Sequence, residues 1–233
     1  MEIIRTEKLN KIYQDHGTPV HALKDINIKI EKGEYIVIAG PSGSGKTTLL
    51  NLLGALDKPS EGKVYFEGED ISMKSKKELS ELRLHKLGFI FQAYNLIPVL
   101  TAMENVEFNM MLNNVSEKER REKALNIMDE LGIKELSNKR PNSMSGGQQQ
   151  RVAVARAIVN NPEVILADEP TANLDSKTGE NLLQLMRKMN ENKNITFIFS
   201  SHDKQVIDQA KRLVLLKDGI IQEEKFFTAD EKH

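Results

Sequence analysis

The amino-acid sequence predicts an α/β fold with a mostly parallel core sheet, an antiparallel β region near the N-terminus and an inserted set of helices. Along most of the chain, short apolar runs alternate with longer amphipathic segments, which is typical of a parallel sheet covered by helices. Near the start, apolar and polar residues alternate one by one, which is typical of strands with one buried face. Between about residues 93 and 161 there is almost no strand signal, so this part is predicted to be helical.

The strand signals are short and follow one another along the chain. The first residues, MEIIRTEKLNKIY, alternate like a strand, and Ile26, Ile28 and Ile30 share one face of another. The remaining predicted strands are YIVIA at 35–39, KVYFEG at 63–68, GFIF at 88–91, EVILAD at 163–168, ITFIFS at 195–200 and RLVLL at 212–216. In LLKDGII, Asp218 and Gly219 supply a two-residue turn, which predicts a terminal hairpin.

Two signatures mark helix starts in the middle of the chain. In each, a hydroxyl residue precedes a glutamate by three positions, as in a capping box: Thr101 with Glu104, and Ser116 with Glu119. After the second start, apolar side chains fall on one helical face at Ala124, Ile127, Met128 and Leu131. We therefore predict a helical subdomain in this part of the chain.

The length and composition suit one globular domain. We predict a single domain over residues 1–233, with an α/β core at 1–92 and 162–233 and a helical subdomain at about 93–161. Apolar residues make up 39% and charged residues 29% of the chain, as in ordinary soluble proteins. Lysine and arginine number 33 against 34 acidic residues, so the balance gives no reason to expect nucleic acid as a partner. The basic runs at 74–77 and 117–123 are interpreted as solvated helix faces.

The composition also excludes some chemistry. The chain has no cysteine, so disulfides, thiolate metal sites and thiol nucleophiles are excluded. Its first residues lack the apolar core of a signal peptide. No window approaches the roughly 18 uninterrupted apolar residues of a membrane helix. If the protein serves a membrane, we expect it to do so from outside the bilayer.

A glycine-rich segment follows the strand at 35–39 and leads into the helix KTTLLNLLGAL. It matches the P-loop pattern, in which glycines let consecutive backbone N–H groups turn toward a phosphate and the helix N-terminus adds partial positive charge. In such a loop, Lys46 neutralises the β- and γ-phosphates and the Thr47 hydroxyl suits Mg²⁺. The predicted nucleotide-binding residues are Gly40, Pro41, Ser42, Gly43, Ser44, Gly45, Lys46, Thr47 and Thr48.

Two adjacent acids end a later predicted strand, in VILADEP. Asp168 lies where a carboxylate reaches a metal bound at the P-loop, and Glu169 is placed to take a proton from water as a general base. Taken alone, such a pair is often a helix cap. After a P-loop, it favours the hydrolysis of a nucleoside triphosphate.

A second anion-binding pattern occurs at SMSGGQQQRVAVARA. Ser145, Gly146, Gly147 and Gln148 stand at the head of a predicted helix with a nearly continuous apolar face. A plain loop and helix cap is the alternative interpretation. Together with the P-loop and the acidic pair, MSGGQ resembles the signature of the nucleotide-binding domains of ABC transporters, and the resemblance covers nearly the whole chain. The sequence departs from the family pattern at two places: Met144 replaces the commoner leucine, and Ala172–Asn173 replaces the commoner Ser–Ala. These departures put in doubt the detailed reaction rates, but not the assignment to the family.

The resemblance implies roles for four more residues. Tyr13 is similar to the aromatic residue that stacks on adenine, and Gln92 to the Q-loop glutamine that senses Mg²⁺ and the attacking water and touches the membrane partner. Asp175 in ANLD is similar to the D-loop acid, and His202 in SSHD to the switch histidine that holds the γ-phosphate. The implied catalytic residues are Lys46, Gln92, Glu169 and His202, and the implied Mg²⁺ ligands are Thr47, Gln92 and Asp168.

The resemblance also implies partners. In this family two copies pack head to tail, and each ATP lies between one copy's P-loop and the other copy's signature. A rigid helix dipole aimed at the γ-phosphate stabilises the ATP-bound pair more than the ADP-bound pair, so hydrolysis opens it. The expected partners are a second copy of this chain and a separate transmembrane permease subunit, with the protein cytoplasmic and peripheral on the inner face of the cell membrane.

Within the family, residues 91–110 resemble the group that drives lipoprotein release, macrolide export and antimicrobial-peptide export or resistance. Residues 93–109 are expected to form part of the dock for the permease; the apolar side chains Leu96, Ile97, Val99 and Leu100 either contribute to it or belong to the core of the helical subdomain. A regulatory ABC ATPase of the cell-division type remains an alternative. A soluble ABC protein acting on ribosomes or DNA fits less well, because such proteins carry two cassettes, a long coiled coil or cysteine-bound zinc, and this chain has one cassette, no long heptad run and no cysteine. A small-molecule kinase would share the P-loop but would not explain SMSGGQ or SSHD.

Overall fold

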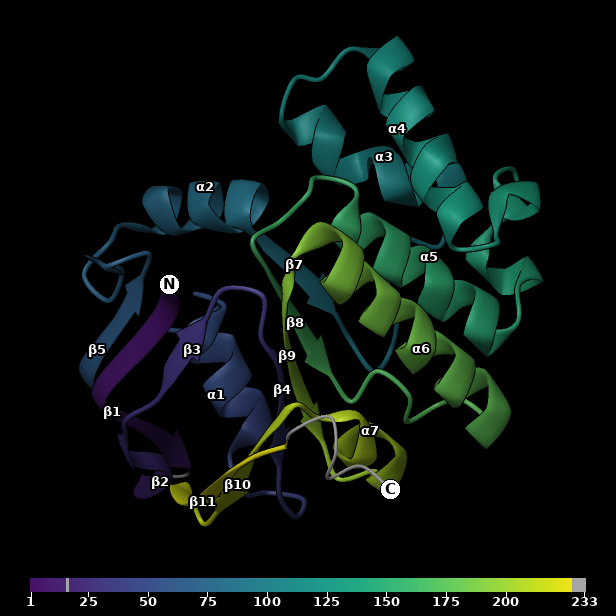
Figure 1. The fold of residues 1–233 in the computed structure, drawn as a ribbon. Coiled ribbons are helices and arrows are strands. Elements are labelled where there is room, and N and C mark those ends of the chain that lie inside the picture. The colour runs from purple at the N-terminus through teal and green to yellow at the C-terminus, as the bar shows by residue number, and fades with distance from the viewer. Residues whose placement is uncertain (16, 228–233) are drawn as a thin grey trace. The chain divides into compact units, whose positions relative to one another are not determined.

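The predicted alternation of strands and helices is confirmed by the computed structural model, which describes residues 1–15 and 17–227 (Figure 1). The single strand predicted through Ile26, Ile28 and Ile30 is wrong, because one strand ends at Ile26 and the next begins at Lys29. The described chain divides into two compact units. The first contains Met1–Arg83 and the segment that begins at Thr196, and the second is Leu84–Ile195. The predicted boundaries of core and helical subdomain, at 92/93 and 161/162, stay a prediction.

The first unit contains the antiparallel region and four strands of the core. Its elements are β1 (Glu2–Asp15), β2 (Thr18–Ile26), β3 (Lys29–Glu31), β4 (Tyr35–Ala39), α1 (Lys46–Leu53), β5 (Glu61–Phe66), β6 (Glu69–Asp70), most of α2 (Lys76–Lys86), β9 (Thr196–Ser201), α7 (Lys204–Gln209), β10 (Arg212–Lys217) and β11 (Ile220–Phe226). β1 pairs antiparallel with β2, β3 and β5. In the core sheet, β4 lies between β9 and β10 and is parallel to both, and β11 pairs antiparallel with β10.

Burial explains why β4 is at the centre of this part of the sheet. All five of its residues are buried, as a strand covered on both faces requires. The ring of Tyr35 lies 4.6 Å from that of Phe199, which in turn stacks on Phe197 at 5.8 Å between ring centroids. The predicted turn at Asp218 and Gly219 is confirmed, with both residues at positive φ, which suits the twist of a two-residue hairpin.

The second unit holds the predicted helices and two parallel strands. Its elements are β7 (Leu87–Ile90), α3 (Ala102–Leu112), α4 (Glu117–Glu130), the 3-10 turns η1 (Lys134–Leu136) and η2 (Pro141–Ser143), α5 (Gly146–Ile158), β8 (Val164–Asp168) and α6 (Ser176–Lys193). Residues 93–161, all of them described, contain no strand, as predicted. α3, α4 and α5 pack against one another around a shared core (Figure 1).

The two predicted helix starts are real, but they differ in detail. Thr101 and Glu104 form the full capping box of α3. The Ser116 hydroxyl caps α4 by accepting a hydrogen bond from the Glu119 backbone. The second hydrogen bond of the predicted capping box, from the Ser116 backbone N–H to the Glu119 carboxylate, is not formed. The Glu119 carboxylate instead lies 2.7 Å from Lys123, one turn along the helix, where an ion pair competes with the cap.

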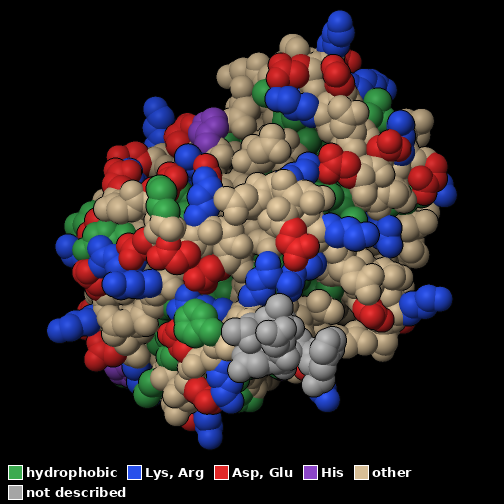
Figure 2. Space-filling model, viewed as in Figure 1, with side chains coloured by type: hydrophobic (Ala, Val, Ile, Leu, Met, Phe, Trp, Pro, Cys, Tyr) green, Lys and Arg blue, Asp and Glu red, His purple; other side chains and the backbone are tan. Residues whose placement is uncertain are grey.

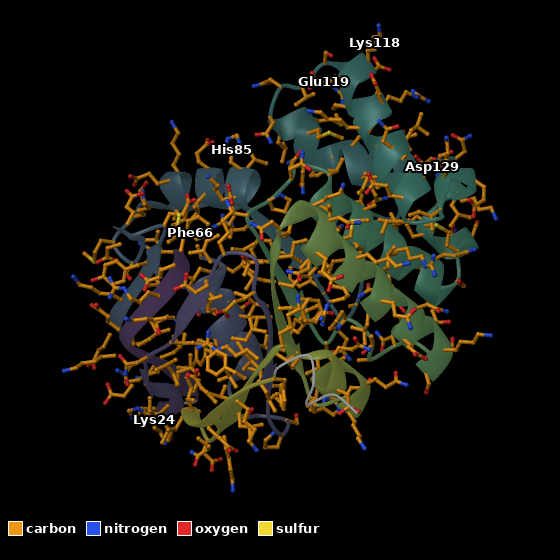
Figure 3. The ribbon with its side chains drawn as sticks, viewed as in Figure 1. Lys24, Phe66, His85, Lys118, Glu119 and Asp129 are labelled. Carbon is orange, nitrogen blue, oxygen red and sulfur yellow. The ribbon has the colours of Figure 1, made fainter. Side chains whose placement is uncertain are left out.

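Most charged residues lie on the surface; Lys46, Glu107 and Arg212 are buried. Lys118 and Glu119 are exposed and point away from the start of α4 (Figure 3). On the face shown in Figure 2, acidic and basic side chains are interspersed over both helices and strands. The run at 117–123 is therefore part of a mixed helix face, as predicted. The run at 74–77 is only half helical, because α2 begins at Lys76 and the half-buried Lys74 before it pairs with Glu69.

Candidate functional site

The P-loop connects β4 to α1 in the first unit, and its glycines are required by the backbone. Gly43 and Gly45 have φ of 78° and 103°, a region that residues with a side chain rarely adopt. A Cβ on Gly40 would lie 2.0 Å from the backbone oxygen of Leu216, so only glycine fits there. Lys46 is buried and donates from Nζ to the backbone oxygens of Gly40 and of its neighbour Pro41, at 2.8 and 3.0 Å. Its ammonium is thus held over the loop that would surround a phosphate.

Replacing Lys46 by Ala is expected to weaken nucleotide binding. The change removes an ammonium poised at the loop, and a charge-assisted hydrogen bond of about 1.5–3 kcal/mol corresponds to roughly a 10- to 100-fold higher Kd for Mg-ATP. Calorimetric titration with Mg-ATP measures the change. Lys24→Ala, on an exposed lysine of the same unit (Figure 3), is the matched control. Normal Mg-ATP binding by Lys46→Ala would contradict the phosphate-binding role of the loop.

Tyr13 lies on β1 beside the start of α1. Its hydroxyl donates to Oδ2 of Asp57 at 3.0 Å, and the Lys11 ammonium lies 4.8 Å from the centre of its ring. Burial and the hydrogen bond to Asp57 raise the pKa of the Tyr13 hydroxyl, against an opposing effect of Thr48, which is within hydrogen-bonding reach. Tyr13 is therefore neutral at pH 7 and 39% exposed, close to one of the P-loop residues.

The strand register brings His202 to the edge at which the P-loop begins. β9 runs parallel to β4, with Ser201 opposite Ala39. His202 and Gly40 are the next residues of the two strands, so both leave the sheet at the same edge. His202 is exposed there. The first unit thus gathers the P-loop, Tyr13 and His202, which are three of the predicted parts of the site.

The second unit gathers Gln92 and the two acids in the same way. β7 and β8 are parallel, with Ile90 opposite Ala167. Asp168 is the last residue of β8, and Gln92 and Glu169 lie just beyond the carboxyl ends of the two neighbouring strands. Glu169 has φ of 45°, an unfavourable backbone region for a residue with a side chain. Such strain persists where surrounding contacts impose it, and it is concentrated at functional sites.

The signature segment starts α5 with a complete capping box. The Ser145 hydroxyl accepts from the Gln148 backbone at 3.3 Å, and the Gln148 side chain accepts from the Ser145 backbone at 3.0 Å. A Cβ on Gly146 or Gly147 would lie 2.7 or 2.5 Å from a neighbouring side chain, so close packing requires both glycines. Behind this start, residues 152–155 are fully buried, which fixes the direction of the helix. The exposed Ser145 and the N-terminal N–H groups can face an anion.

The comparisons with known proteins agree with these motifs. Residues 23–172 match the family described as ABC transporter. This chain belongs to that family. As an ABC ATPase it is 45% identical over 227 residues to the ABC transporter ATP-binding protein MJ0796 of Methanocaldococcus jannaschii, covering 96% of this chain and 97% of the relative. The solved dimer of MJ0796 in a post-hydrolysis state with ADP and Pi superposes with a TM-score of 0.91 at 43% identity, covering 97% of this chain and 100% of that one.

Two further relatives have names that include a transported substrate. The ABC ATPase is 41% identical to the lipoprotein-releasing system ATP-binding protein LolD of Idiomarina loihiensis, over 96% of this chain and 98% of LolD. It is 42% identical to the macrolide export ATP-binding/permease protein MacB of Bdellovibrio bacteriovorus, over 96% of this chain but 34% of MacB. Among the described residues of the ABC ATPase, no helix combines the length and apolar character needed to cross a bilayer.

Several contacts of the ABC ATPase have no counterpart among the sequence motifs. The fully buried Gln150 donates to the backbone oxygen of Pro170 at 2.7 Å and so ties α5 to the loop after Glu169. Asn173 donates to the backbone oxygen of Gln92 at 2.9 Å. Because both acceptors are main-chain carbonyls, no pattern of side chains in the sequence marks these contacts.

Asp175 has a structural contact of its own. It caps α6, with its side chain accepting from the Thr178 backbone at 3.0 Å. Hydrogen bonds to Thr178 lower the pKa of the Asp175 carboxyl, which is therefore ionised at neutral pH and complements the positive end of α6.

Proposed function

We propose that this protein is the ATP-hydrolysing subunit of an ABC transporter and works as a head-to-tail pair of identical chains on a separate transmembrane subunit. The observation that carries the proposal is the second anion-binding helix start, at Ser145. The chain already has a phosphate loop, and a single nucleotide needs only one. A pair of chains uses both, since the Ser145 helix of one copy then faces the nucleotide held by the Lys46 loop of the other. The family membership and the dimeric MJ0796 support this arrangement.

The proposed division of roles follows the chemistry of the side chains. Glu169 takes a proton from the attacking water, and Lys46 with His202 stabilises charge on the γ-phosphate. Gln92 orients the water, and Tyr13 offers its neutral ring to adenine. The remaining proposed nucleotide contacts are the P-loop backbone, the signature residues Ser145, Gly146, Gly147 and Gln148, and Asp175.

The proposed cofactor is Mg²⁺. Thr47, Gln92 and Asp168 offer a hydroxyl, an amide and a carboxylate oxygen, the hard donors that Mg²⁺ prefers. The described residues contain no cluster of three or more acidic or histidine side chains that could hold a metal. When bound, Mg²⁺ supplies charge neutralisation between the β- and γ-phosphates.

We further propose that residues 93–109 form part of the dock for the permease. Of the four apolar residues predicted for the dock, Val99 is 73% exposed and available for contact, whereas the others are half-buried. Met111 and Leu112 at the end of α3 add exposed apolar surface, at 51% and 57%. The likeness to LolD and MacB supports export or release of a lipoprotein or a macrolide. An antimicrobial peptide is a third proposed cargo, and the proposed location is the cytoplasmic face of the cell membrane.

The pairing can be tested by dilution of the isolated chain. If each reaction centre needs two copies, ATP turnover per chain rises in proportion to protein concentration well below the Kd of the pair and reaches a plateau above it. Steady-state phosphate release from nanomolar to micromolar protein, at saturating Mg-ATP, measures this dependence. Full turnover per chain at the lowest concentration, with no membrane component present, would overturn the proposal.

A further inference from the structure

The backbone directly after Gln92 forms a strained turn. Tyr94 and Asn95 both have left-handed backbone conformations, with φ of 61° and 49°. For Tyr94 this conformation costs about 1–2 kcal/mol, whereas asparagine adopts it more readily. Two in succession persist only where neighbouring groups hold the turn in place.

Arg156 of α5 is one of the groups that hold it. Its guanidinium donates to the backbone oxygens of Asn95 and Tyr94, at 2.5 and 2.9 Å. Among the described residues it forms no ion pair, so these carbonyls take the place of an acidic partner. Burial lowers the pKa of the Arg156 guanidinium, as expected for a cation held by neutral groups. The turn is therefore fixed to the helix that begins with the signature.

The side chain of Tyr94 adds a second contact with the same helix. A Cβ built on Gly146, the first residue of α5, would lie 2.7 Å from the Tyr94 hydroxyl oxygen and 3.6 Å from the backbone oxygen of Asn173. The turn after Gln92, the start of α5 and the loop between β8 and α6 thus meet at one glycine.

Asn173 holds Gln92 itself. Its side-chain amide donates to the backbone oxygen of Gln92 at 2.9 Å, across 81 residues of sequence. Asn173 lies four residues after Glu169, in the short loop that leads to α6. The backbone that carries the Gln92 side chain is therefore tied to the loop that carries the general base.

We propose that Asn173 is a positioning residue for ATP hydrolysis, which fixes Gln92 relative to Glu169 through the hydrogen bond to the Gln92 carbonyl. Arg156 and Tyr94 fix the other side of the same turn to the signature helix. A displacement of residues 93–100 then reaches both the water-orienting glutamine and the start of α5. The inference rests on the proposed role of Gln92.

The sharpest test is Asn173→Asp in the full chain. The side chain keeps its shape, but an oxygen replaces the amide donor and faces the Gln92 carbonyl oxygen. We expect kcat for ATP hydrolysis to fall about 10-fold, the loss from one broken and now repulsive hydrogen bond. KM for ATP is expected to stay within twofold, because the P-loop belongs to the compact unit that does not contain Asn173. The Tm is expected to stay within about 3 °C, because Asn173 is exposed. Asn181→Asp, the same change at an exposed position on α6, is the matched control and keeps wild-type kcat.

A double-mutant cycle separates positioning from a general structural effect. Gln92→Ala removes the side chain but keeps the backbone carbonyl that Asn173 binds. If Asn173 acts through the Gln92 side chain, Asn173→Asp changes kcat less than twofold in the Gln92→Ala background. Two results would overturn the positioning role of Asn173 without affecting the proposed role of Gln92. One is that the losses of kcat in the two single variants add in the double variant. The other is that Asn173→Asp keeps a normal kcat although Gln92→Ala is slow. Wild-type turnover by Gln92→Ala would instead overturn the proposed role of Gln92, and the positioning role with it.

Discussion

Replacing Glu169 by Gln is expected to reduce ATP turnover about 100-fold or more while leaving ATP binding intact. Glutamine keeps the size and polarity of the side chain but cannot accept the proton of the attacking water, and general bases contribute roughly 10²–10⁴-fold to rates. The strained φ of 45° is unaffected by the change, so the fold should not respond. Phosphate release at saturating Mg-ATP gives the turnover, and calorimetry gives the Kd.

The same variant should collect in the paired state. Hydrolysis is the step that opens the pair. A variant that binds ATP but does not hydrolyse it is therefore expected to elute as a dimer in the presence of ATP and as a monomer in the presence of ADP. Glu180→Gln, on the exposed face of α6, should behave as the wild type in both measurements. Turnover by Glu169→Gln equal to that of the parent chain would refute the role of this residue as the base.

Sequence reasoning predicted the elements whose causes are local. The five residues of β4 are apolar in sequence and buried in the structure, and the Thr101 box starts α3 where the spacing predicts. The Asp218–Gly219 turn is equally local, because only the backbone of those residues decides it. Adjacent positions in the chain therefore carried enough information for the strands, the helix starts and the P-loop.

Contacts between distant segments were beyond that reasoning. The sequence marks Asn173 only as an uncommon residue in its loop, and Gln150 and Arg156 only as parts of a predicted helix. Their partners are backbone oxygens that lie between 20 and 81 residues away, and main-chain carbonyls look alike in every sequence. Even the local capping box predicted at Ser116 is only partly formed, because the Glu119 carboxylate pairs with Lys123 one turn along the helix.

Replacing Ser145 by Arg should abolish ATP-driven pairing while a single copy still binds ATP. Ser145 is exposed at the start of α5, so a long side chain there projects into the space where the partner's nucleotide would bind. The P-loop belongs to the other compact unit, which the change does not touch. Ser145→Ala is the matched control: it loses the cap, about 1 kcal/mol of helix stability, without adding bulk, and should still pair. With ATP present, the double variant Glu169→Gln, Ser145→Arg should elute as a single copy and not as a dimer. If Ser145→Arg also lost ATP binding, the result would indicate misfolding.

The head-to-tail arrangement also predicts that two different defective variants restore activity when they are mixed. Lys46→Ala has a defective P-loop and an intact signature, and Ser145→Arg has the reverse, so each protein alone builds only defective centres. A mixed pair contains one centre with both halves intact and one with neither. Mixing the two inactive proteins at high concentration is therefore expected to restore ATP turnover, up to one working centre per mixed pair. The restored rate should peak at an equimolar ratio, because the mixed pair is then most abundant. A mixture that stays inactive, although Ser145→Arg binds ATP and both proteins are folded, would mean that the two anion-binding elements do not meet across the pair.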